Sequence, residues 1–432
     1  MKLKELGNKK SATRLICGTF ASLMVVGSVS GCGVVDKLSS VGEKPEIIDD
    51  SDNADNSSAA SFEEDSSDVR HKTDEIEGII DKYFYFDQDE QKREESYYDG
   101  IMKGLDDPYS VYYTKEEYDK LMEEDSGKFE GIGATVSKDN EKGTIYIVKP
   151  IVGSPAEKAG LLPDDILVAV DDLDITTDME LDYVVDHIRG EKGTKVTLKV
   201  YREGEPDYLY IDIVRDTITN TTVNYEMLDN KIGYIQIEQF VENTPELYKN
   251  AIDDLVSQGA KGLVFDVRNN PGGLLKAVIE MADYVIDDSK VAEGADSAGL
   301  LLQTKDKDDK VQEEYSCEDK HSVDLPIAVL VNGNSASASE IFSGCLKDYG
   351  VATIVGTTTY GKGIVQSIMK LKDGSAIKLT IAQYFLPSGT AVHKVGVEPD
   401  VEVELNDDQK RKITIEHDKD NQLQEAIKQL GK

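Results

Sequence analysis

The sequence has few basic residues, few histidines and few cysteines. Its 432 residues include 48 Lys and Arg against 84 Asp and Glu, which gives a formal net charge of −36. This charge argues against a nucleic-acid-binding protein, which needs a basic surface to displace counterions from phosphates. The five His and four Cys form neither an H-E-x-x-H nor a C-x-x-C motif, so we expect no metal site and no cofactor.

A long apolar run occurs over residues 15–35, and five basic residues precede it between Lys2 and Arg14. A basic stretch followed by a short apolar core is typical of a secretory signal. The segment Val29-Ser30-Gly31-Cys32 resembles a bacterial lipobox, which predicts a signal peptide over residues 1–31 and lipid attachment at Cys32. An uncleaved membrane anchor is the alternative. In both cases the remaining chain lies on the extracytoplasmic face of the cell membrane.

An acidic segment follows the apolar run. Residues 43–68 carry ten acidic residues, one lysine and almost no aromatic residue. Such a composition cannot offset its ordering entropy by burial, so we expect a disordered stalk over residues 32–70. Two further cysteines, Cys317 and Cys345, could pair in a disulfide in an oxidising compartment, although the apolar helical pattern around Cys345 favours a buried thiol.

The remaining chain is long enough for two or three globular domains of about 150 residues. Helical spacing of apolar residues predicts a small helical region over residues 71–125, with no chemistry of its own. Short strands and Gly-rich turns predict a β-rich unit over 126–216. Strands alternating with helices predict βαβ units around a partly parallel sheet over 217–406, and 407–432 ends in an amphipathic helix.

The β-rich unit resembles a PDZ domain. Residues 160–167, Gly-Leu-Leu-Pro-Asp-Asp-Ile-Leu, look like the most recognisable segment of such domains. Gly131, Ile132, Gly133 and Ala134 match the loop whose backbone N–H groups receive the C-terminal carboxylate of a peptide. A dinucleotide-binding fingerprint fails here because its third glycine is absent.

Two loops of the second half carry candidate chemistry. Residues 266–273 end in a Gly-Gly pair between a strand and a helix, where backbone N–H groups can face outward as an oxyanion site. Residues 335–340, Ser-Ala-Ser-Ala-Ser-Glu, place a hydroxyl group at a helix N-terminus, whose dipole stabilises developing negative charge. On their own, the serines are better explained as helix caps.

A third loop contains Lys362. The segment 356–363 nearly matches the phosphate-binding motif G-x-x-x-x-G-K-[ST], but Gly363 replaces the hydroxyl residue. Lys362 and Gln366 have the same parity on the strand expected there, so both side chains can point to one face. These loops contain no His and the chain has no G-x-S-x-G. A serine nucleophile would therefore need another base, and a lysine can serve where burial lowers its pKa.

Together these segments resemble the carboxyl-terminal processing peptidases, which are tail-specific serine proteases with an embedded PDZ domain. The resemblance covers about residues 75–402 and includes Asp107-Pro108-Tyr109 and residues 387–400. It implies an α/β (βαβ, ClpP/crotonase-like) protease core, an inserted PDZ domain and short N- and C-terminal helical regions. The family pattern maps the nucleophile to Ser337, the general base to Lys362, the residue orienting that base to Gln366, and the oxyanion N–H groups to Gly272, or Gly273, and Ala338.

The resemblance implies acyl transfer on proteins or peptides with exposed, apolar C-termini, captured by the PDZ groove. Flanking helices at both ends are compatible with a homodimer. A non-catalytic PDZ scaffold that binds tails without cutting them is the alternative. A penicillin-recognising S-x-x-K site is excluded because both candidate pairs, Ser367 with Lys370 and Ser375 with Lys378, lie in strand-like sequence, where positions i and i+3 face opposite sides.

Overall fold

The computed structural model describes residues 59–139, 142–318, 320–410 and 415–431. The predicted signal peptide (1–31), the lipidation site Cys32 and most of the predicted stalk lie outside the described residues. Within the described ranges, no helix is both long and apolar enough to cross a membrane.

The last part of the predicted stalk is helical, which corrects the expectation of disorder there. Helix α1 spans Ala59–Tyr83 and so begins eleven residues before the end of the predicted stalk at residue 70. Ala59, Ala60, Glu63 and Glu64 are good helix formers, and they continue without a break into the amphipathic pattern that follows.

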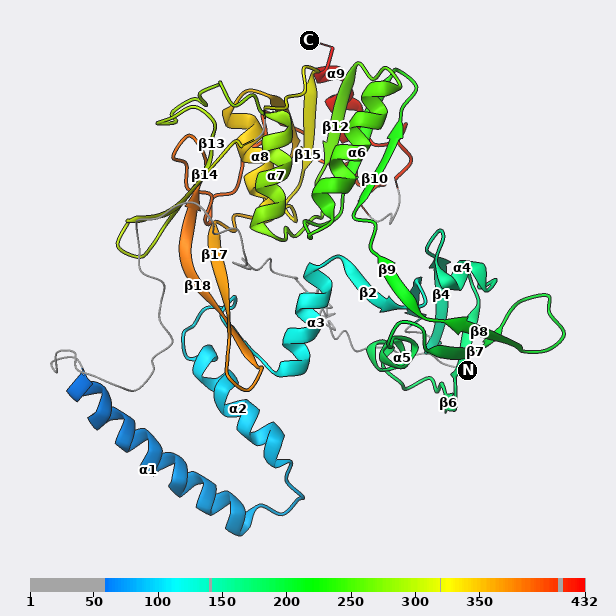
Figure 1. The fold of residues 1–432 in the computed structure, drawn as a ribbon, viewed down its shortest axis with the longest axis vertical. Coiled ribbons are helices and arrows are strands. Elements are labelled where there is room, and N and C mark those ends of the chain that lie inside the picture. The colour runs from blue at the N-terminus through cyan, green and yellow to red at the C-terminus, as the bar shows by residue number, and fades with distance from the viewer. Residues whose placement is uncertain (1–58, 140–141, 319, 411–414, 432) are drawn as a thin grey trace, which may run out of the picture.

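The N-terminal region is a helical hairpin followed by a short strand and a third helix. Its elements are α1, α2 (Glu90–Lys103), β1 (Val111–Tyr113) and α3 (Lys115–Asp125). The hairpin of α1 and α2 projects away from the rest of the molecule (Figure 1). Thr114 caps α3 in a reciprocal pair of hydrogen bonds with Glu117. Strand β1 was not expected, because its partner is distant in sequence.

The β-rich unit has a core of its own, formed by residues such as Ile145, Ile147 and Leu198. Its sheet has the order β3-β4-β5-β7-β8, and a ribbon of β2 and β9 joins the unit to the rest of the chain (Figure 1). The elements are β2 (Lys128–Gly131), β3 (Ala134–Asp139), β4 (Thr144–Pro150), α4 (Pro155–Lys158), β5 (Ile166–Val170), β6 (Leu173–Asp174), α5 (Leu181–Ile188), β7 (Lys195–Tyr201), β8 (Leu209–Val214) and β9 (Asp216–Thr219).

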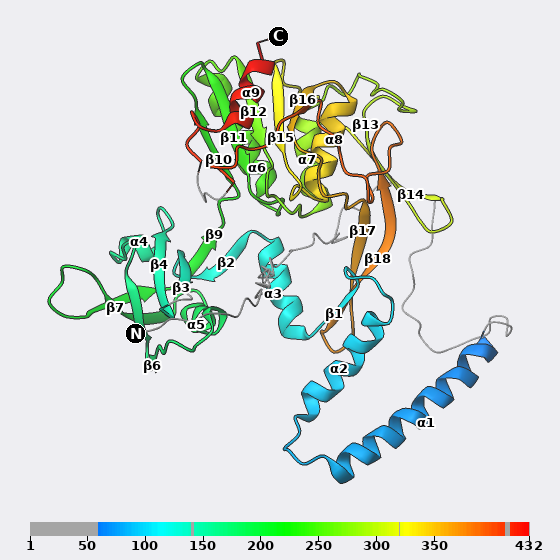
Figure 2. The ribbon, with the colours of Figure 1, turned by 180° about the vertical axis from the view of Figure 1, so that it is seen from behind.

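The α/β core is built on a six-stranded sheet of order β10-β11-β12-β15-β16-β19, parallel except for β10. Helices α6, α7 and α8 pack on one face and α9 on the other (Figure 2). The elements are β10 (Val223–Met227), β11 (Ile232–Ile237), α6 (Thr244–Ser257), β12 (Gly262–Asp266), α7 (Leu275–Val285), β15 (Ile327–Val331), α8 (Ala338–Asp348), β16 (Ala352–Gly356), β19 (Val401–Glu402) and α9 (Asn421–Gln429).

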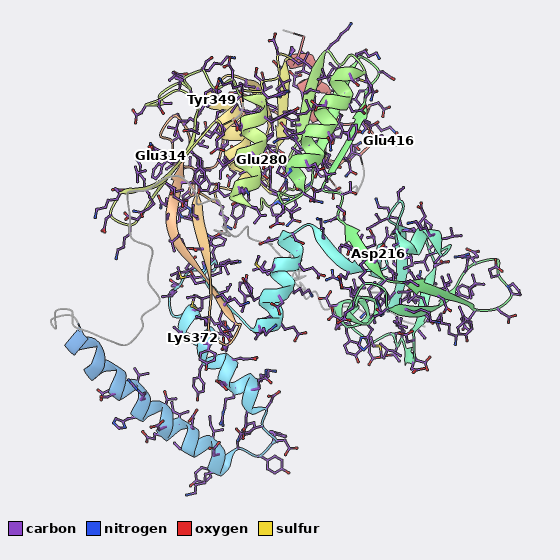
Figure 3. All side chains as sticks on the ribbon, in the orientation of Figure 1. Asp216, Glu280, Glu314, Tyr349, Lys372 and Glu416 are labelled. Atoms are coloured by element: carbon purple, nitrogen blue, oxygen red, sulfur yellow. The ribbon has the colours of Figure 1, made fainter. Side chains whose placement is uncertain are left out.

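A second sheet connects this core to the N-terminal region. It has the order β1-β18-β13-β14, with β17 also paired to β18. Its remaining strands are β13 (Leu300–Lys305), β14 (Val311–Ser316), β17 (Ile364–Lys370) and β18 (Ala376–Phe385). The β17–β18 ribbon extends from the core towards α2, and Lys372 marks its tip (Figure 3). Because β1 pairs with β18, the residues just before β1 come close to the loops of the core.

Candidate active site

The serine loop is fixed by hydrogen bonds to the neighbouring loop of residues 266–273. Ser335 Oγ donates to Val267 O at 2.7 Å and Ser339 Oγ donates to Asn270 O at 2.9 Å. The middle serine, Ser337, is the N-cap residue of α8 and has φ 53° and ψ −114°. Such a backbone conformation is strained for a residue with a Cβ, and strain of this kind is concentrated at functional sites. The two outer serines therefore hold the loop, and Ser337 stands between them.

Lys362 is buried, with 2% of its surface exposed. Burial lowers its pKa to about 7 and the positive charge of Lys378 adds to this effect, while Asp107 and Glu340 oppose it. An amine with such a pKa is partly neutral at physiological pH and can accept a proton. Its Nζ lies 4.4 Å from the centre of the Tyr109 ring. In the described part of the chain, no hydrogen bond joins Nζ to Ser337 or Gln366; such contacts are often long before substrate binds.

Glu340 joins the serine loop to the lysine loop. Its fully buried carboxylate accepts hydrogen bonds from the backbone N–H groups of Ser337 at 2.9 Å, Lys362 at 2.8 Å and Gly361 at 2.7 Å. Burial raises the pKa of Glu340, and these hydrogen bonds oppose that rise. Glu340 was not among the residues predicted from the sequence. The S-x-x-E spacing from Ser337 to Glu340, typical of a helix N-terminus, is the signal that could have found it.

The two glycines of the 266–273 loop differ in their hydrogen bonding. The N–H of Gly272 donates to Asn270 Oδ1 at 2.8 Å, so it is already satisfied. The N–H groups of Gly273 and Ala338 have no acceptor among the described residues. A Cβ on Gly272 would lie 2.8 Å from Ala336 O and 2.9 Å from Ser337 Cβ, so the loops approach each other closely at this point. This geometry favours Gly273 and Ala338 over Gly272 as oxyanion donors.

Gln366 lies in the same narrow pocket as Ser337, Ala338 and Gly273. Its Nε2 donates to Thr380 Oγ1 at 3.4 Å, and the side chain is buried. The strand alternation expected to place Gln366 and Lys362 on one face does not extend to the lysine, because β17 spans Ile364–Lys370 and begins two residues after Lys362. Gln366 thus lines the same pocket as Ser337, and among the described residues no hydrogen bond joins its side chain to Lys362.

The remaining wall of the pocket is apolar. Its side chains come from α7, α8, β17 and β18: Leu275, Ile341, Ile364, Val365 and Tyr384. Tyr384 Oη also donates to the backbone carbonyl of Ser337 at 3.2 Å. The free volume is only about 20 Å³, so the pocket fits a small apolar group.

The predicted carboxylate loop lies between β2 and β3. The carbonyl of Ile132 accepts from Ala156 N–H at 2.8 Å and that of Gly133 accepts from Ile151 N–H at 2.9 Å. Among the described strands, β3 pairs with β4 on one edge and with none on its other edge, and α5 packs against it. An unpaired strand beside a helix is the arrangement that receives an extended peptide as an added strand.

The N-terminal region contributes to the site, contrary to the expectation that it has no chemistry. The negative charge of Asp107 raises the pKa of Lys362, and the ring of Tyr109 lies 4.4 Å from Lys362 Nζ. Sequence spacing could not reveal this proximity, because it depends on the pairing of β1 with β18.

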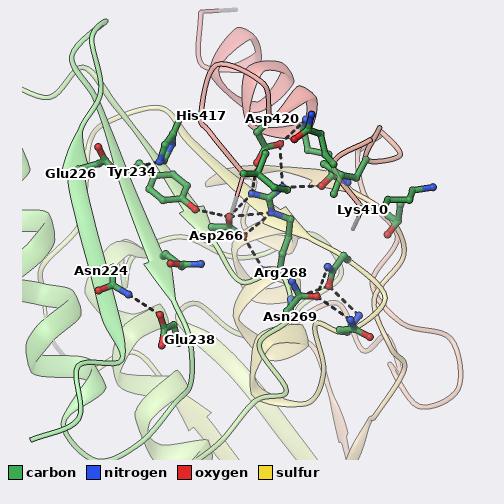
Figure 4. Close-up of a pocket in the computed structure, with 18 of the residues that line it drawn as sticks. Asn224, Glu226, Tyr234, Glu238, Asp266, Arg268, Asn269, Lys410, His417 and Asp420 are labelled. Atoms are coloured by element: carbon green, nitrogen blue, oxygen red, sulfur yellow. Dashed lines mark hydrogen bonds and ion pairs between the residues drawn. The ribbon is translucent and has the colours of Figure 1, made fainter. Parts of the chain in front are cut away.

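A separate pocket of about 800 Å³ lies on the α9 face of the sheet (Figure 4). None of the predicted site residues lines it. Inside it, Arg268 bonds to Asp266 at 2.6 Å and to Asp420 at 2.7 Å. Burial disfavours the charge on Arg268, but the two carboxylates outweigh burial and raise its pKa. This network ties α9 to the end of β12.

The fold and the site define a class of protein: a mixed α/β protein with an inserted β unit, in which a strained serine and a buried lysine of lowered pKa are held by one carboxylate. Residues 231–403 match the model of peptidase family S41, and residues 146–202 match the model of the PDZ domain. The chain belongs to peptidase family S41. The predicted resemblance to the carboxyl-terminal processing peptidases is thereby confirmed, as are the mixed α/β class and the PDZ domain.

Sequence similarity to two bacterial proteins supports the same family. The chain is 40% identical over 324 residues to the carboxy-terminal processing protease CtpA of Bacillus subtilis, covering 75% of this chain and 66% of that protein. It is 40% identical over 332 residues to a "Probable CtpA-like serine protease" of Staphylococcus epidermidis, covering 77% of this chain and 65% of the relative. The chain thus spans slightly less than two thirds of these relatives. A solved S41-type structure from Bacteroides fragilis shares the fold, with 18% identity, a TM-score of 0.50 and coverage of 77% and 90%.

Proposed function

We propose that this protein is a serine endopeptidase that captures exposed C-terminal tails in its PDZ domain and cleaves the bound chain with Ser337 and Lys362. The observation that carries this proposal is the shared carboxylate of Glu340, which binds the backbone N–H groups of both residues. One buried group thus fixes the nucleophile and the base relative to each other.

The proposed reaction is acyl transfer. Neutral Lys362 takes the proton of the Ser337 hydroxyl as Oγ attacks the peptide carbonyl carbon. The N–H groups of Gly273 and Ala338 hold the oxyanion, and the proton on Lys362 passes to the leaving amine. Water, deprotonated by the same lysine, then hydrolyses the acyl-enzyme. Gln366 borders the serine and orients the base when substrate closes the site.

The substrate class follows from two surfaces. The small apolar pocket beside Ser337 favours cleavage next to a small apolar residue, because a charged side chain would lose its hydration there without a partner. The unpaired edge of β3 with the loop of residues 131–134 favours a free C-terminal carboxylate.

The proposal extends to the location and assembly of the protein. The signal peptide of residues 1–31 and a lipid on Cys32 would anchor it at the extracytoplasmic face of the cell membrane. Large apolar side chains exposed on the α1–α2 hairpin, such as Ile79 (53%) and Ile101 (68%), support a homodimer. We further propose that the core is of the ClpP/crotonase-like type. The domain boundaries given above also remain predictions.

A non-catalytic PDZ scaffold is not favoured, because the S41 match covers Ser337, Lys362 and Gln366 together.

Mass spectrometry of a peptide with an apolar C-terminus, incubated with the full chain in detergent, tests the function. We expect cleavage of the free-acid peptide, slower cleavage of its C-terminal amide, and none by Ser337→Ala or Lys362→Ala at unchanged melting temperature. Cleavage by either variant would refute the mechanism, and binding without cleavage by the natural chain would favour the scaffold.

A further inference from the structure

The turn of residues 107–110 is built to stay in one place. The Asp107 carboxylate accepts hydrogen bonds from Tyr109 N–H at 3.1 Å and from Ser110 Oγ–H at 2.6 Å. Ser110 Oγ in turn accepts from the backbone N–H of Thr380 in β18 at 3.1 Å, and Ser110 is buried. Directly after the turn, β1 pairs with β18, with Val111 opposite Lys378. The turn is therefore fixed to the ribbon that begins just after Lys362.

The fixed turn presents the Tyr109 ring to Lys362. The Nζ atom lies 4.4 Å from the ring centre, within the range of a cation–π interaction. Burial, with the neighbouring phenol of Tyr360, raises the pKa of Tyr109 to about 12, so the ring stays neutral. Because Lys362 is 2% exposed, the ring takes the place of water around the amine.

We propose that Tyr109 is a positioning residue for Lys362: its ring holds the amine in place and stabilises the ammonium ion that forms when Lys362 takes the serine proton. This inference rests on the proposed function, since it assigns Lys362 the role of the base. It gives a role to the contact between the N-terminal region and the lysine loop.

Several ionisable groups face Lys362 from the elements around it. They are Asp107 and Tyr109 of the turn, Glu340 of α8 and Lys378 of β18, and Tyr360 lies beside Tyr109. Replacing only the ring changes none of the charged groups. The effect of the ring can therefore be separated from that of the charges.

The test is a titration of Lys362 that does not depend on activity. Lysine is labelled with ¹³C at Cε in the full chain, and the Lys362 signal is assigned by its loss in Lys362→Gln. We expect Tyr109→Leu and Tyr109→Met, which remove the ring, to lower the titration midpoint by about one pH unit, a tenfold change in the ratio of ammonium to amine. Tyr109→Phe, which keeps the ring, should leave the midpoint where it is.

The matched control is Tyr118→Leu. Lys370 Nζ lies 5.2 Å from the centre of the Tyr118 ring, so this variant removes a similar pair at the far end of β17. It should change neither the Lys362 midpoint nor peptide cleavage. In the cleavage assay, Tyr109→Leu should lower kcat about tenfold with KM unchanged, because the ring acts on the base and not on substrate binding.

A midpoint that is unchanged or higher in both ringless variants would overturn the inference, whatever the activity. If the midpoint falls as expected but the natural chain cleaves no peptide, the proposed function fails and the positioning of Lys362 by Tyr109 stands. If Tyr109→Leu cleaves the peptide with the same kcat as the natural chain, the ring has no part in the reaction.

Discussion

Glu340 and Lys362 are joined by a hydrogen bond of 2.8 Å between the buried carboxylate of the first and the backbone N–H of the second. The same oxygen accepts the N–H of Ser337 at 2.9 Å. A side chain on α8 thus determines the distance between two loops that are 25 positions apart. The carboxylate also binds Gly361 and Thr359, so that no acceptor capacity is left for water.

Replacing Glu340 should therefore cost both stability and activity. Glu340→Ala leaves several buried donors without an acceptor, and we expect the free energy of unfolding to fall by about 4 kcal/mol. Glu340→Gln keeps one acceptor oxygen and should cost about half as much. Urea denaturation measures both values. Glu280→Ala, which removes an exposed carboxylate paired with Lys249, should stay within about 0.5 kcal/mol. Equal losses for Glu340→Ala and Glu280→Ala would contradict this account.

The pH dependence of cleavage should follow the charges around Lys362. Its neutral form is the base, so kcat/KM should rise with pH through about 7, the pKa of Lys362. Lys378→Gln removes a positive charge that lowers this pKa, and the rising limb should move to higher pH. Asp107→Asn removes a charge that raises it, and the limb should move to lower pH.

The control for these charge changes is Lys372→Gln, at the exposed tip of the β17–β18 ribbon. Its charge is solvated and screened, so the limb should stay in place. Shifts of Lys378→Gln and Asp107→Asn in the same direction would exclude Lys362 as the group that titrates.

Gly272 should not tolerate a side chain. Its φ of +109° disfavours other residues, and a Cβ would meet Ala336 O, Ser337 Cβ and Ala338 N at 3.0 Å or less. We expect Gly272→Ala to abolish cleavage and to lower the free energy of unfolding by about 3 kcal/mol. Gly259 also has a positive φ, +83°, but open space around it. Gly259→Ala should cost only about 1 kcal/mol and leave kcat unchanged. If Gly272→Ala still cleaves the peptide, the loop of residues 266–273 and the serine loop can move apart.

Much of the fold could be predicted because its signals are local. The βαβ alternation of the core and the Gly-Leu-Leu-Pro-Asp-Asp-Ile-Leu segment of the PDZ domain each lie within a few consecutive residues. The start of α1 at residue 59 was not predicted, because the acidic composition of that segment indicated disorder more strongly than its helix-forming residues indicated a helix.

The parts of the site that escaped prediction depend on contacts between distant segments. Lys378 Nζ donates to Tyr113 Oη across 265 positions of sequence, and the same pairing of β1 with β18 places Tyr109 at Lys362. The shared face expected for Lys362 and Gln366 depended on where the strand begins. β17 begins at Ile364, and the apolar alternation that predicts a strand does not fix its first residue.

Arg268 should be needed for the attachment of α9. It lies between Asp266 at the end of β12 and Asp420 at the start of α9, and all three side chains are at most 11% exposed (Figure 4). Arg268→Met leaves two buried carboxylates without a cation, and we expect the free energy of unfolding to fall by about 4 kcal/mol. Adding Asp266→Asn and Asp420→Asn removes those charges and should restore at least half of the loss, because the cost comes from unpaired charge and not from lost packing. Hydrogen exchange should show faster exchange of α9 amides in Arg268→Met, whereas Lys428→Met, which removes an exposed pair with Glu425, should leave them unchanged. If the triple variant is no more stable than Arg268→Met, the packing of the arginine side chain rather than its charge holds α9 to the sheet.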